Sequence, residues 1–122
     1  FIPLNPEMSL GDMLHQGVSK SSRNLFPVVD AKINLVGIVS LDSIRDVMFD
    51  QSLHETTSVE TFMRNPLDII IYEKDTMQQV MRKFQNTGAW NLPVLKNGTY
   101  YGFVSKSKLL TAYRRELINF TS

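Results

Sequence analysis

The chain has 122 residues, which is enough for one compact domain or for two closely packed halves. Hydrophobic residues make up 43% of it, so the composition supports a packed core and excludes a disordered tail. The formal net charge is +1, which excludes the strong basic excess typical of nucleic-acid-binding proteins. There is no cysteine, which excludes a disulfide framework, a thiolate metal site and a cysteine nucleophile, and fits a reducing compartment.

No apolar run approaches the ~20 residues that a membrane-spanning helix needs. The longest run, from Leu67 to Tyr72, is interrupted by Asp68. The first residues, Phe1 to Leu4, contain neither an initiator Met nor the basic and apolar regions of a signal peptide. We therefore expect the chain to be a segment of a longer polypeptide.

The first half of the sequence predicts the order strand, helix, strand, strand, helix. A short apolar strand formed by Ile2 and Leu4 precedes a helix that Ser9 caps. A polar turn joins the next two strands, and a second helix begins after Ser40. The apolar face of this second helix is predicted to consist of Ile44, Val47 and Met48.

A polar stretch at residues 54–58 marks the boundary between the two halves, and residues 56–66 are predicted to form a connector helix. Thr57 and Glu60 have the spacing of a capping box, in which each side chain caps the backbone of the other residue. Pro66 lacks a backbone N–H and is expected to end this helix.

The second half predicts the same order of elements. An apolar strand at residues 69–71 precedes a helix with a capping box formed by Thr76 and Gln79. Asn97-Gly98 predicts a tight hairpin, because both central residues of a type I′ turn need positive φ. The last helix begins after Ser105. The helix that begins after Thr76 is predicted to have one apolar face, formed by Met77, Val80, Met81 and Phe84.

The two halves repeat one another in sequence. Phe26-Pro27-Val28-Val29 returns as Leu92-Pro93-Val94-Leu95, and the two prolines lie 66 residues apart. A repeat of this length is too long for a solenoid unit and too short for two independent domains. We therefore predict an α+β fold in which two half-modules share one core around a pseudo-twofold axis, with repeats at 1–55 and 67–122.

This doubled pattern resembles a tandem pair of CBS domains, often called a Bateman module. The resemblance is carried by Phe26-Pro27 and Leu92-Pro93, by the turns from Gly37 to Ser40 and from Gly102 to Ser105, and by the connector from Val59 to Met63. It covers essentially the whole chain. It implies two β-α-β-β-α CBS repeats that pack with pseudo-twofold symmetry around one shared core.

A narrower resemblance is to the cytoplasmic CBS regions of bacterial ClC-type chloride channels and transporters. It is carried by the segments from Thr87 to Pro93 and from Gly102 to Lys108. The resemblance implies an attached transmembrane anion-conducting domain and a place on the cytoplasmic side of the bacterial inner membrane. It also implies a homodimer formed through the CBS helices.

The resemblance further implies a ligand site for an adenine nucleotide, with ATP, ADP or AMP as a regulatory ligand and no cofactor required. The adenine is expected near the strand starts Phe26-Pro27 and Leu92-Pro93, and the hydroxyls of Ser40 and Ser105 match the family's phosphate-side serine. A helix N-terminus favours an anion through its free N–H groups and its dipole. For the serines, an ordinary helix cap is the alternative role, and for the prolines the start of a strand.

The family's ribose-binding Asp is missing from both repeats. Its positions hold Ser43 and Lys108, and Asp42 stands one residue early, which on a helix turns the side chain by roughly 100°. Ordinary ATP or AMP binding is therefore expected to be compromised.

Three further residues are candidates for ligand contact in the second half. Lys106 and Lys108 lie in the first turn of a helix, where a cation costs ~0.3–1 kcal/mol unless an anion is bound. The alternative is that both lysines are simply solvated. Trp90 could stack on a purine, or it could belong to the core or to an interface.

Three functions remain open from the sequence. The first is a sensor whose bound nucleotide biases the gate of an attached membrane domain. The second is a structural dimerisation module with empty clefts, which the missing Asp favours. The third is a CBS module of another transporter or of a soluble enzyme. The sequence has no recognisable catalytic motif, so we expect no enzymatic activity in this chain.

Overall fold

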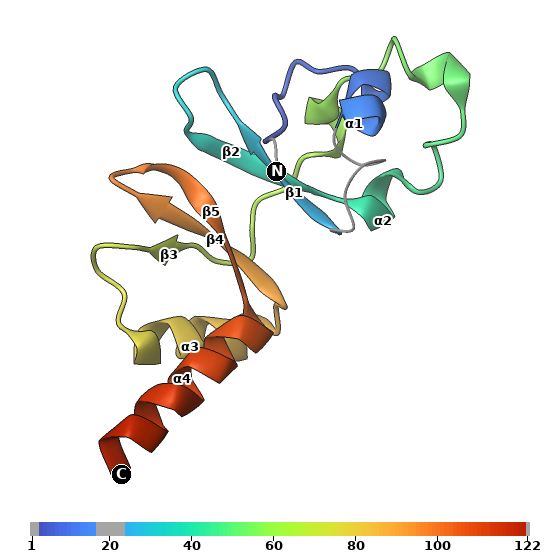
Figure 1. Ribbon diagram of the computed structural model, residues 1–122. Helices are drawn as coiled ribbons and strands as arrows, with labels where there is room; N and C mark the ends of the chain where they lie inside the picture. Colours follow the sequence, from blue (N-terminus) through green and yellow to red (C-terminus); the bar gives the residue numbers. More distant parts are fainter. Residues whose placement is uncertain (1–2, 17–23, 122) are drawn as a thin grey trace. The chain divides into compact units, whose positions relative to one another are not determined.

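The computed structural model describes residues 3–16 and 24–121 and divides the chain into two compact units. Unit 1 comprises residues 1–65 and unit 2 comprises residues 66–122. Both units combine short helices with a small sheet, which confirms the predicted α+β class (Figure 1). The predicted packing of the two repeats about a pseudo-twofold axis stays a prediction.

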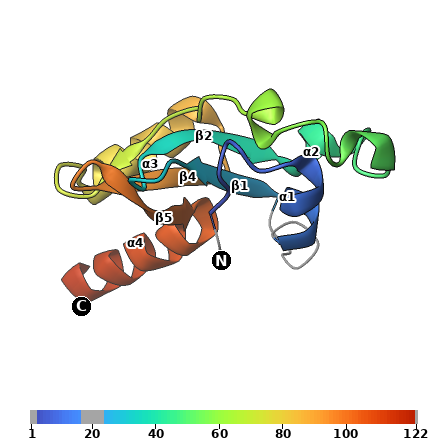
Figure 2. The same ribbon diagram turned by 90° about the horizontal axis from the view of Figure 1, so that it is seen from above.

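Unit 1 is built on an antiparallel hairpin of two strands (Figure 2). Leu4 adds a single parallel bridge to Val28, with hydrogen bonds of 2.8 Å from Leu4 N to Pro27 O and from Val29 N to Leu4 O. The predicted first strand is thus reduced to one bridging residue, and Ile2 lies outside the described residues. The elements of unit 1 are α1 (Leu10–Gln16), β1 (Leu25–Val29), β2 (Leu35–Ser40), α2 (Leu41–Ile44) and the 3₁₀-helices η2 (Gln51–Leu53) and η3 (Val59–Phe62).

The second helix of unit 1 is shorter than predicted. It ends at Ile44, and Val47 and Met48 lie in the turns that follow. The backbone changes there to hydrogen bonds between residues three apart, from Arg45 N to Asp42 O and from Val47 N to Ile44 O. This turn structure keeps a near-helical spacing, so Ile44 is still buried and Val47 still packs against the core.

The predicted capping box at Thr57 and Glu60 is wrong. The short helix η3 begins one residue later, with Ser58 as its N-cap residue and no capping hydrogen bond from a side chain. The reason is that the backbone of Thr57 pairs elsewhere: its carbonyl accepts a hydrogen bond from Leu10 N at 2.7 Å, and its N–H donates to Leu53 O at 3.0 Å. Tertiary pairing with α1 overrides the local capping pattern.

Unit 2 has the predicted order of strand, helix, strand, strand, helix. Its sheet has the order β3-β4-β5, in which β3 is parallel to β4 and β5 is antiparallel to β4. Helices α3 and α4 both contribute to the core beneath this sheet (Figure 1). The elements are β3 (Ile70–Ile71), α3 (Met77–Thr87), β4 (Asn91–Lys96), β5 (Thr99–Ser105) and α4 (Lys106–Thr121).

Local sequence signals set the ends of these elements. The capping box of α3 is confirmed: Thr76 N donates to Gln79 Oε1 at 2.8 Å and Gln79 N donates to Thr76 Oγ1 at 3.2 Å. Gly88 ends the helix in the left-handed conformation, with φ of 68°. Asn97 and Gly98 have φ of 53° and 81°, which confirms the predicted hairpin turn between β4 and β5.

The buried apolar side chains form one cluster in each unit. In the predicted stripe of α3, Val80 and Phe84 are buried, while Met77 and Met81 are partly buried against them. The cluster of unit 1 is Leu4, Leu10, Met13, Phe26, Val28, Val39, Ile44 and Val59. The cluster of unit 2 is Ile70, Val80, Phe84, Ala89, Leu92, Val94 and Leu109.

A search of residues 3–16 and 24–121 for membrane-spanning helices found none that combines the necessary length with sufficient apolar character. Over the same residues, no three His, Asp or Glu side chains gather in a way that could hold a metal ion.

Candidate ligand-binding site

The two predicted ligand regions share one backbone arrangement. In unit 1 the first N–H of α2, from Leu41, donates to the carbonyl of Asn24 at 2.8 Å. In unit 2 the first N–H of α4, from Lys106, donates to the carbonyl of Trp90 at 2.9 Å. In each unit the residue just before the first strand of the hairpin is therefore fixed beside the start of the second helix.

In unit 1 the candidate serine is already engaged. Ser40 is 8% exposed, and its hydroxyl accepts a hydrogen bond from Ser43 N at 3.3 Å as the cap of α2. The Ser43 hydroxyl, at the position of the family's Asp, donates to the carbonyl of Ser40 at 2.7 Å. Asp42 forms an exposed ion pair with Arg45 at 2.8 Å. The polar groups here satisfy one another.

In unit 2 the candidate residues surround the start of a long helix. Ser105 precedes the 16 residues of α4 and its hydroxyl accepts a hydrogen bond from Lys108 N at 3.2 Å. Lys108 is exposed, while Ser105 and Lys106 are partly buried. The positive end of the helix dipole and two lysines of its first turn therefore meet at one place, which favours an anion.

Trp90 adds an aromatic surface to this place. Its side chain is 74% exposed, so it does not belong to the core, and Lys106 Nζ lies 5.4 Å from the centre of its ring. This distance allows a cation–π interaction. A cation, a helix N-terminus and an exposed indole are thus held together by the backbone bond between Lys106 and Trp90.

The four remaining candidates lie in the interior. Phe26 is 0% exposed and Leu92 is 1% exposed, and both belong to the buried clusters. Pro27 and Pro93 are also almost fully buried, each opposite a residue of the partner strand. Their contact with a ligand stays a prediction.

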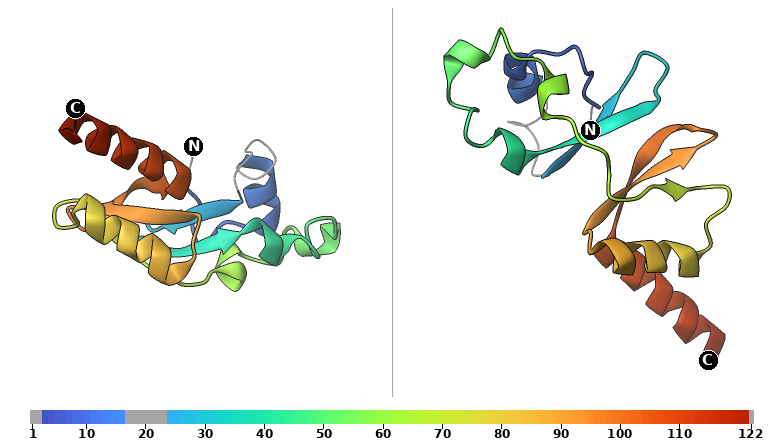
Figure 3. Two further views of the ribbon diagram at one scale, coloured as in Figure 1. Left: turned by 90° about the horizontal axis from the view of Figure 1, so that it is seen from below. Right: turned by 180° about the vertical axis from the view of Figure 1, so that it is seen from behind.

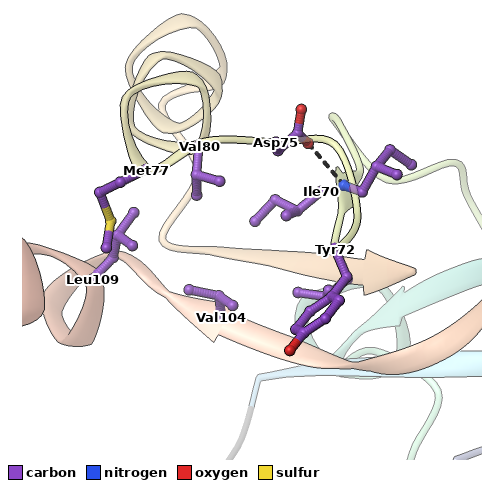
Figure 4. Close-up of a pocket in the computed structure, with 9 residues that line it drawn as sticks. Ile70, Tyr72, Asp75, Met77, Val80, Val104 and Leu109 are labelled. Atoms are coloured by element: carbon purple, nitrogen blue, oxygen red, sulfur yellow. Dashed lines mark hydrogen bonds between the residues drawn. The ribbon is translucent and has the colours of Figure 1, made fainter. Parts of the chain in front are cut away.

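Unit 2 also contains a pocket of about 240 Å³ that the sequence did not predict (Figure 4). Strand and helix side chains face into it from β3, α3, β5 and α4. The charged residue of its wall is Asp75, whose Oδ2 accepts hydrogen bonds from Ile71 N at 2.7 Å and from Lys83 Nζ at 2.8 Å. The lining residues are Ile70, Ile71, Tyr72, Asp75, Met77, Val80, Val94, Val104 and Leu109.

This pocket suits an uncharged apolar group and not a phosphate. Its walls are mainly aliphatic, and Asp75, the charged residue among those that line it, is already paired with Lys83, so the lining offers no cation to an anion. No sequence motif marks it, because it arises where core side chains fill the space between sheet and helices incompletely.

Comparison with known proteins gives the family. The sequence matches the CBS domain over residues 1–50 and 52–115. A comparison with curated protein sequences gave no match.

Solved structures with a similar fold are CBS domain proteins. A CBS domain-containing protein of unknown function from Bacillus anthracis aligns with a TM-score of 0.78 and 17% identity, over 93% of this chain and 84% of that chain. CBSX2 in complex with AMP aligns with a TM-score of 0.72 and 24% identity, over 93% and 87% of the two chains. The CBS domain of a bacterial CNNM/CorC family Mg²⁺ transporter in complex with ATP aligns with a TM-score of 0.72 and 15% identity, over 90% and 76%.

At these identities the structural matches support the fold alone. The sequence match, in contrast, extends over most of both units and includes both hairpins and both second-helix starts. The chain therefore belongs to the CBS domain family.

Proposed function

We propose that this chain is a regulatory CBS module that binds an adenine nucleotide at the start of α4 in unit 2. The observation that carries the proposal is the exposed ring of Trp90 beside Lys106 and the capped N-terminus of α4. Two solved structures with this fold, CBSX2 with AMP and a CNNM/CorC CBS domain with ATP, support the choice of ligand.

Each group has a distinct part in the proposed site. The purine stacks on Trp90, and the phosphate accepts hydrogen bonds from the N-terminal turn of α4 while Lys106 and Lys108 balance its charge. No carboxylate stands at position 108 to accept a hydrogen bond from the ribose. We therefore expect weaker binding than a site with the family's Asp provides.

The host proposed for this module is a ClC-like chloride channel or transporter. The module lies on the cytoplasmic side of the bacterial inner membrane, attached to a transmembrane anion-conducting domain. Regulation requires that the nucleotide binds more tightly in one state of the gate than in the other. The similarity of Thr87 to Pro93 and of Gly102 to Lys108 to ClC-type CBS regions supports this assignment.

The alternative is a structural dimerisation module without a ligand, or a nucleotide-sensing module of another transporter or of a soluble enzyme. The arrangement in unit 1 favours the structural role there, because Ser40 and Ser43 satisfy one another and Asp42 is paired with Arg45.

Intrinsic fluorescence tests the nucleotide proposal directly, because Trp90 is the single tryptophan of the chain. We expect ATP, ADP or AMP to quench its emission saturably and to raise the melting temperature, since ~100 times the dissociation constant contributes ~2.7 kcal/mol. S-adenosylmethionine and simple anions serve as comparison ligands, and calorimetry confirms any binding.

Lys106→Ala is expected to weaken nucleotide binding about 10-fold, the effect of one lost charge-assisted contact. The matched control is Lys32→Ala, which removes an exposed lysine from a turn of unit 1 and should leave binding unchanged. The absence of quenching and of a melting shift at millimolar nucleotide contradicts the sensor role and supports the structural role.

A homodimer formed through the CBS helices is also part of the proposal. Exposed apolar side chains such as Phe49, which is 86% exposed, support an association surface. We expect light scattering at high micromolar protein concentration to give twice the mass of the chain. A monomeric mass at that concentration contradicts the dimer and leaves the nucleotide proposal intact.

A further inference from the structure

The apolar pocket of unit 2 is large enough for a small organic group. Its volume is about 240 Å³, whereas a dry apolar cavity of about 150 Å³ already binds benzene. Its lining comes from the sheet, from α3, from the start of α4 and from the loop that leads from β3 to α3 (Figure 3). All of these residues belong to unit 2, so the pocket is formed within one unit.

The walls of this pocket suit the apolar part of a ligand. Aliphatic side chains such as Ile70, Val80 and Val104 face it (Figure 4). The charge of Asp75 is balanced by Lys83, whose Nζ lies 2.8 Å from Asp75 Oδ2. An aromatic ring or a short aliphatic chain would leave water here without burying an unpaired polar group.

An aromatic pair and a cation stand beside one wall of the pocket. Tyr72 lines the pocket, and the centre of its ring lies 5.5 Å from the centre of the ring of Tyr101. Lys96 Nζ lies 4.7 Å from the centre of the Tyr72 ring and 5.0 Å from that of Tyr101. Two cation–π contacts therefore hold the ammonium group next to a residue of the pocket wall.

The charge of Lys96 is not balanced by a carboxylate. Within residues 3–16 and 24–121, no ion pair includes Lys96. The carboxylate of Glu73, in the loop after β3, accepts a hydrogen bond from Asn97 N instead. Lys96 is partly buried, unlike the exposed Lys74 of the same region, so its ammonium group has a fixed position and fewer water contacts. Such a group favours an anion that arrives with its own apolar support.

We infer that unit 2 binds a small amphipathic carboxylic acid, whose apolar body fills the pocket and whose carboxylate pairs with Lys96. Lys96 does not line the pocket, so the carboxylate lies outside it, past the ring of Tyr72, and a few methylene groups must join it to the body. Pocket and cation together define the ligand: the pocket selects the body, and the lysine selects the negative charge.

This site is separate from the proposed nucleotide site. The residues that carry the nucleotide proposal are Trp90, Ser105, Lys106 and Lys108, and none of them lines the pocket. Failure of nucleotide binding would therefore leave the carboxylic acid proposal intact, and failure of carboxylic acid binding would leave the nucleotide proposal intact.

The test is a titration of the chain with 4-phenylbutyrate, followed by NMR of its methyl groups. We expect saturable shifts of the pocket methyls, those of Ile70, Val80 and Val104. The matched neutral probe, 4-phenylbutan-1-ol, should bind about 10-fold more weakly, because it lacks the charge-assisted contact. Butyrate, which lacks the ring, should cause no shift at the same concentrations. Unmoved pocket methyls at millimolar 4-phenylbutyrate overturn the proposal, and equal affinity for the acid and the alcohol overturns the role of Lys96.

Variants of the two parts of the site give a second test. Lys96→Gln should weaken binding of the acid about 10-fold and leave binding of the alcohol unchanged. The matched control is Arg82→Gln, which removes the same charge from an exposed position of α3 and should change neither. Unchanged affinity of the Lys96→Gln chain for the acid contradicts the proposal.

Filling the pocket should block both probes. Val104 lines the pocket and is partly buried, so Val104→Phe is expected to place its ring in this space and to weaken the acid and the alcohol at least ~10-fold alike. The amide spectrum shows whether this variant folds, and Lys96→Gln decides the matter if it does not. A folded Val104→Phe chain that binds both probes as tightly as the parent shows that the body does not enter the pocket and overturns the proposal.

Discussion

Replacing Phe84 by Ala is expected to lower the free energy of unfolding by about 3–5 kcal/mol, the usual cost of removing a buried aromatic side chain. Phe84 is 0% exposed and is the largest member of the core cluster of unit 2. It lies on α3 and packs with side chains from β4 and α4, so the cavity left by its removal lies where sheet and helices meet. Urea denaturation followed by far-ultraviolet circular dichroism measures this loss.

Leu67→Ala is the control for this truncation. Leu67 is 68% exposed, so removing its large apolar side chain should alter stability by less than about 0.5 kcal/mol. Hydrogen exchange adds a local readout: in the Phe84→Ala protein the amides of α3 and β4 should exchange faster than in the parent. A loss of less than about 1 kcal/mol at Phe84 would show that α3 does not pack on the sheet as described.

The sequence predicted those elements whose determinants are local. The capping box at Thr76 and the turn at Asn97-Gly98 each depend on a few neighbouring residues, and both form as expected. The repeated apolar-Pro segments also identified both hairpins, because proline and its flanking apolar residues set the same register in each.

Elements determined by distant contacts were not predictable in the same way. Thr57 and Glu60 have a capping pattern, but the carbonyl of Thr57 accepts a hydrogen bond from Leu10, which is far from that pattern in the sequence. The helix after Ser40 stops at Ile44 although the apolar periodicity continues to Met48. At Thr57 tertiary pairing outweighs a weak local preference, and after Ile44 the backbone continues in turns with hydrogen bonds between residues three apart.

For the candidate site, the sequence identified residue types but not their surroundings. It placed Ser105, Lys106 and Trp90 in one region, and the structure brings them together around the start of α4. It could not show that Ser40 is satisfied by Ser43, because that depends on hydroxyl geometry in a four-residue helix. The pocket beside Asp75 had no sequence signal, since it is a gap in packing and not a motif.

A partly buried ion pair in unit 2 ties the first strand to α3. Lys83 Nζ donates hydrogen bonds to the carbonyl of Ile69 at 2.6 Å and to Asp75 Oδ2 at 2.8 Å. Asp75 Oδ2 also accepts a hydrogen bond from Ile71 N at 2.7 Å. The lysine and the carboxylate together satisfy two backbone groups beside β3, and their side chains are 24% and 11% exposed.

Lys83→Met, which keeps an unbranched side chain that is one atom shorter and has no charge, is expected to destabilise the protein by about 2–3 kcal/mol. The cost arises because Asp75 keeps a charge in a mostly buried place and the carbonyl of Ile69 loses its donor. Urea denaturation at neutral pH measures the loss. Lys74→Met is the control, because Lys74 is exposed in the turn after β3 and its replacement should be nearly neutral.

The pH dependence of stability tests the same pair independently. Burial alone raises the pKa of Asp75, but the hydrogen bonds from Lys83 and Ile71 and the charge of Lys83 outweigh it and hold the pKa below its usual range. A carboxyl whose pKa is lower in the folded state stabilises the protein above its unfolded pKa, and this stabilisation is lost as pH falls through the folded pKa. The pKa of Asp30 is lowered as well, mainly by hydrogen bonds from Asn34. Because Lys83→Met does not change the surroundings of Asp30, its effect on the pH dependence of stability is the same in the parent and in the variant.

We therefore expect the stability difference between the parent and Lys83→Met to be constant near neutral pH and to shrink as acid protonates Asp75, first in the variant and at lower pH in the parent, where Lys83 holds its pKa down. Urea midpoints measured from about pH 6 to about pH 3 give this difference directly. Asp75→Asn should remove the dependence altogether, since the amide does not titrate. Parallel curves for parent and Lys83→Met across this range would show that Lys83 does not set the pKa of Asp75, and the tie between β3 and α3 would then depend on the backbone bond from Ile71 alone.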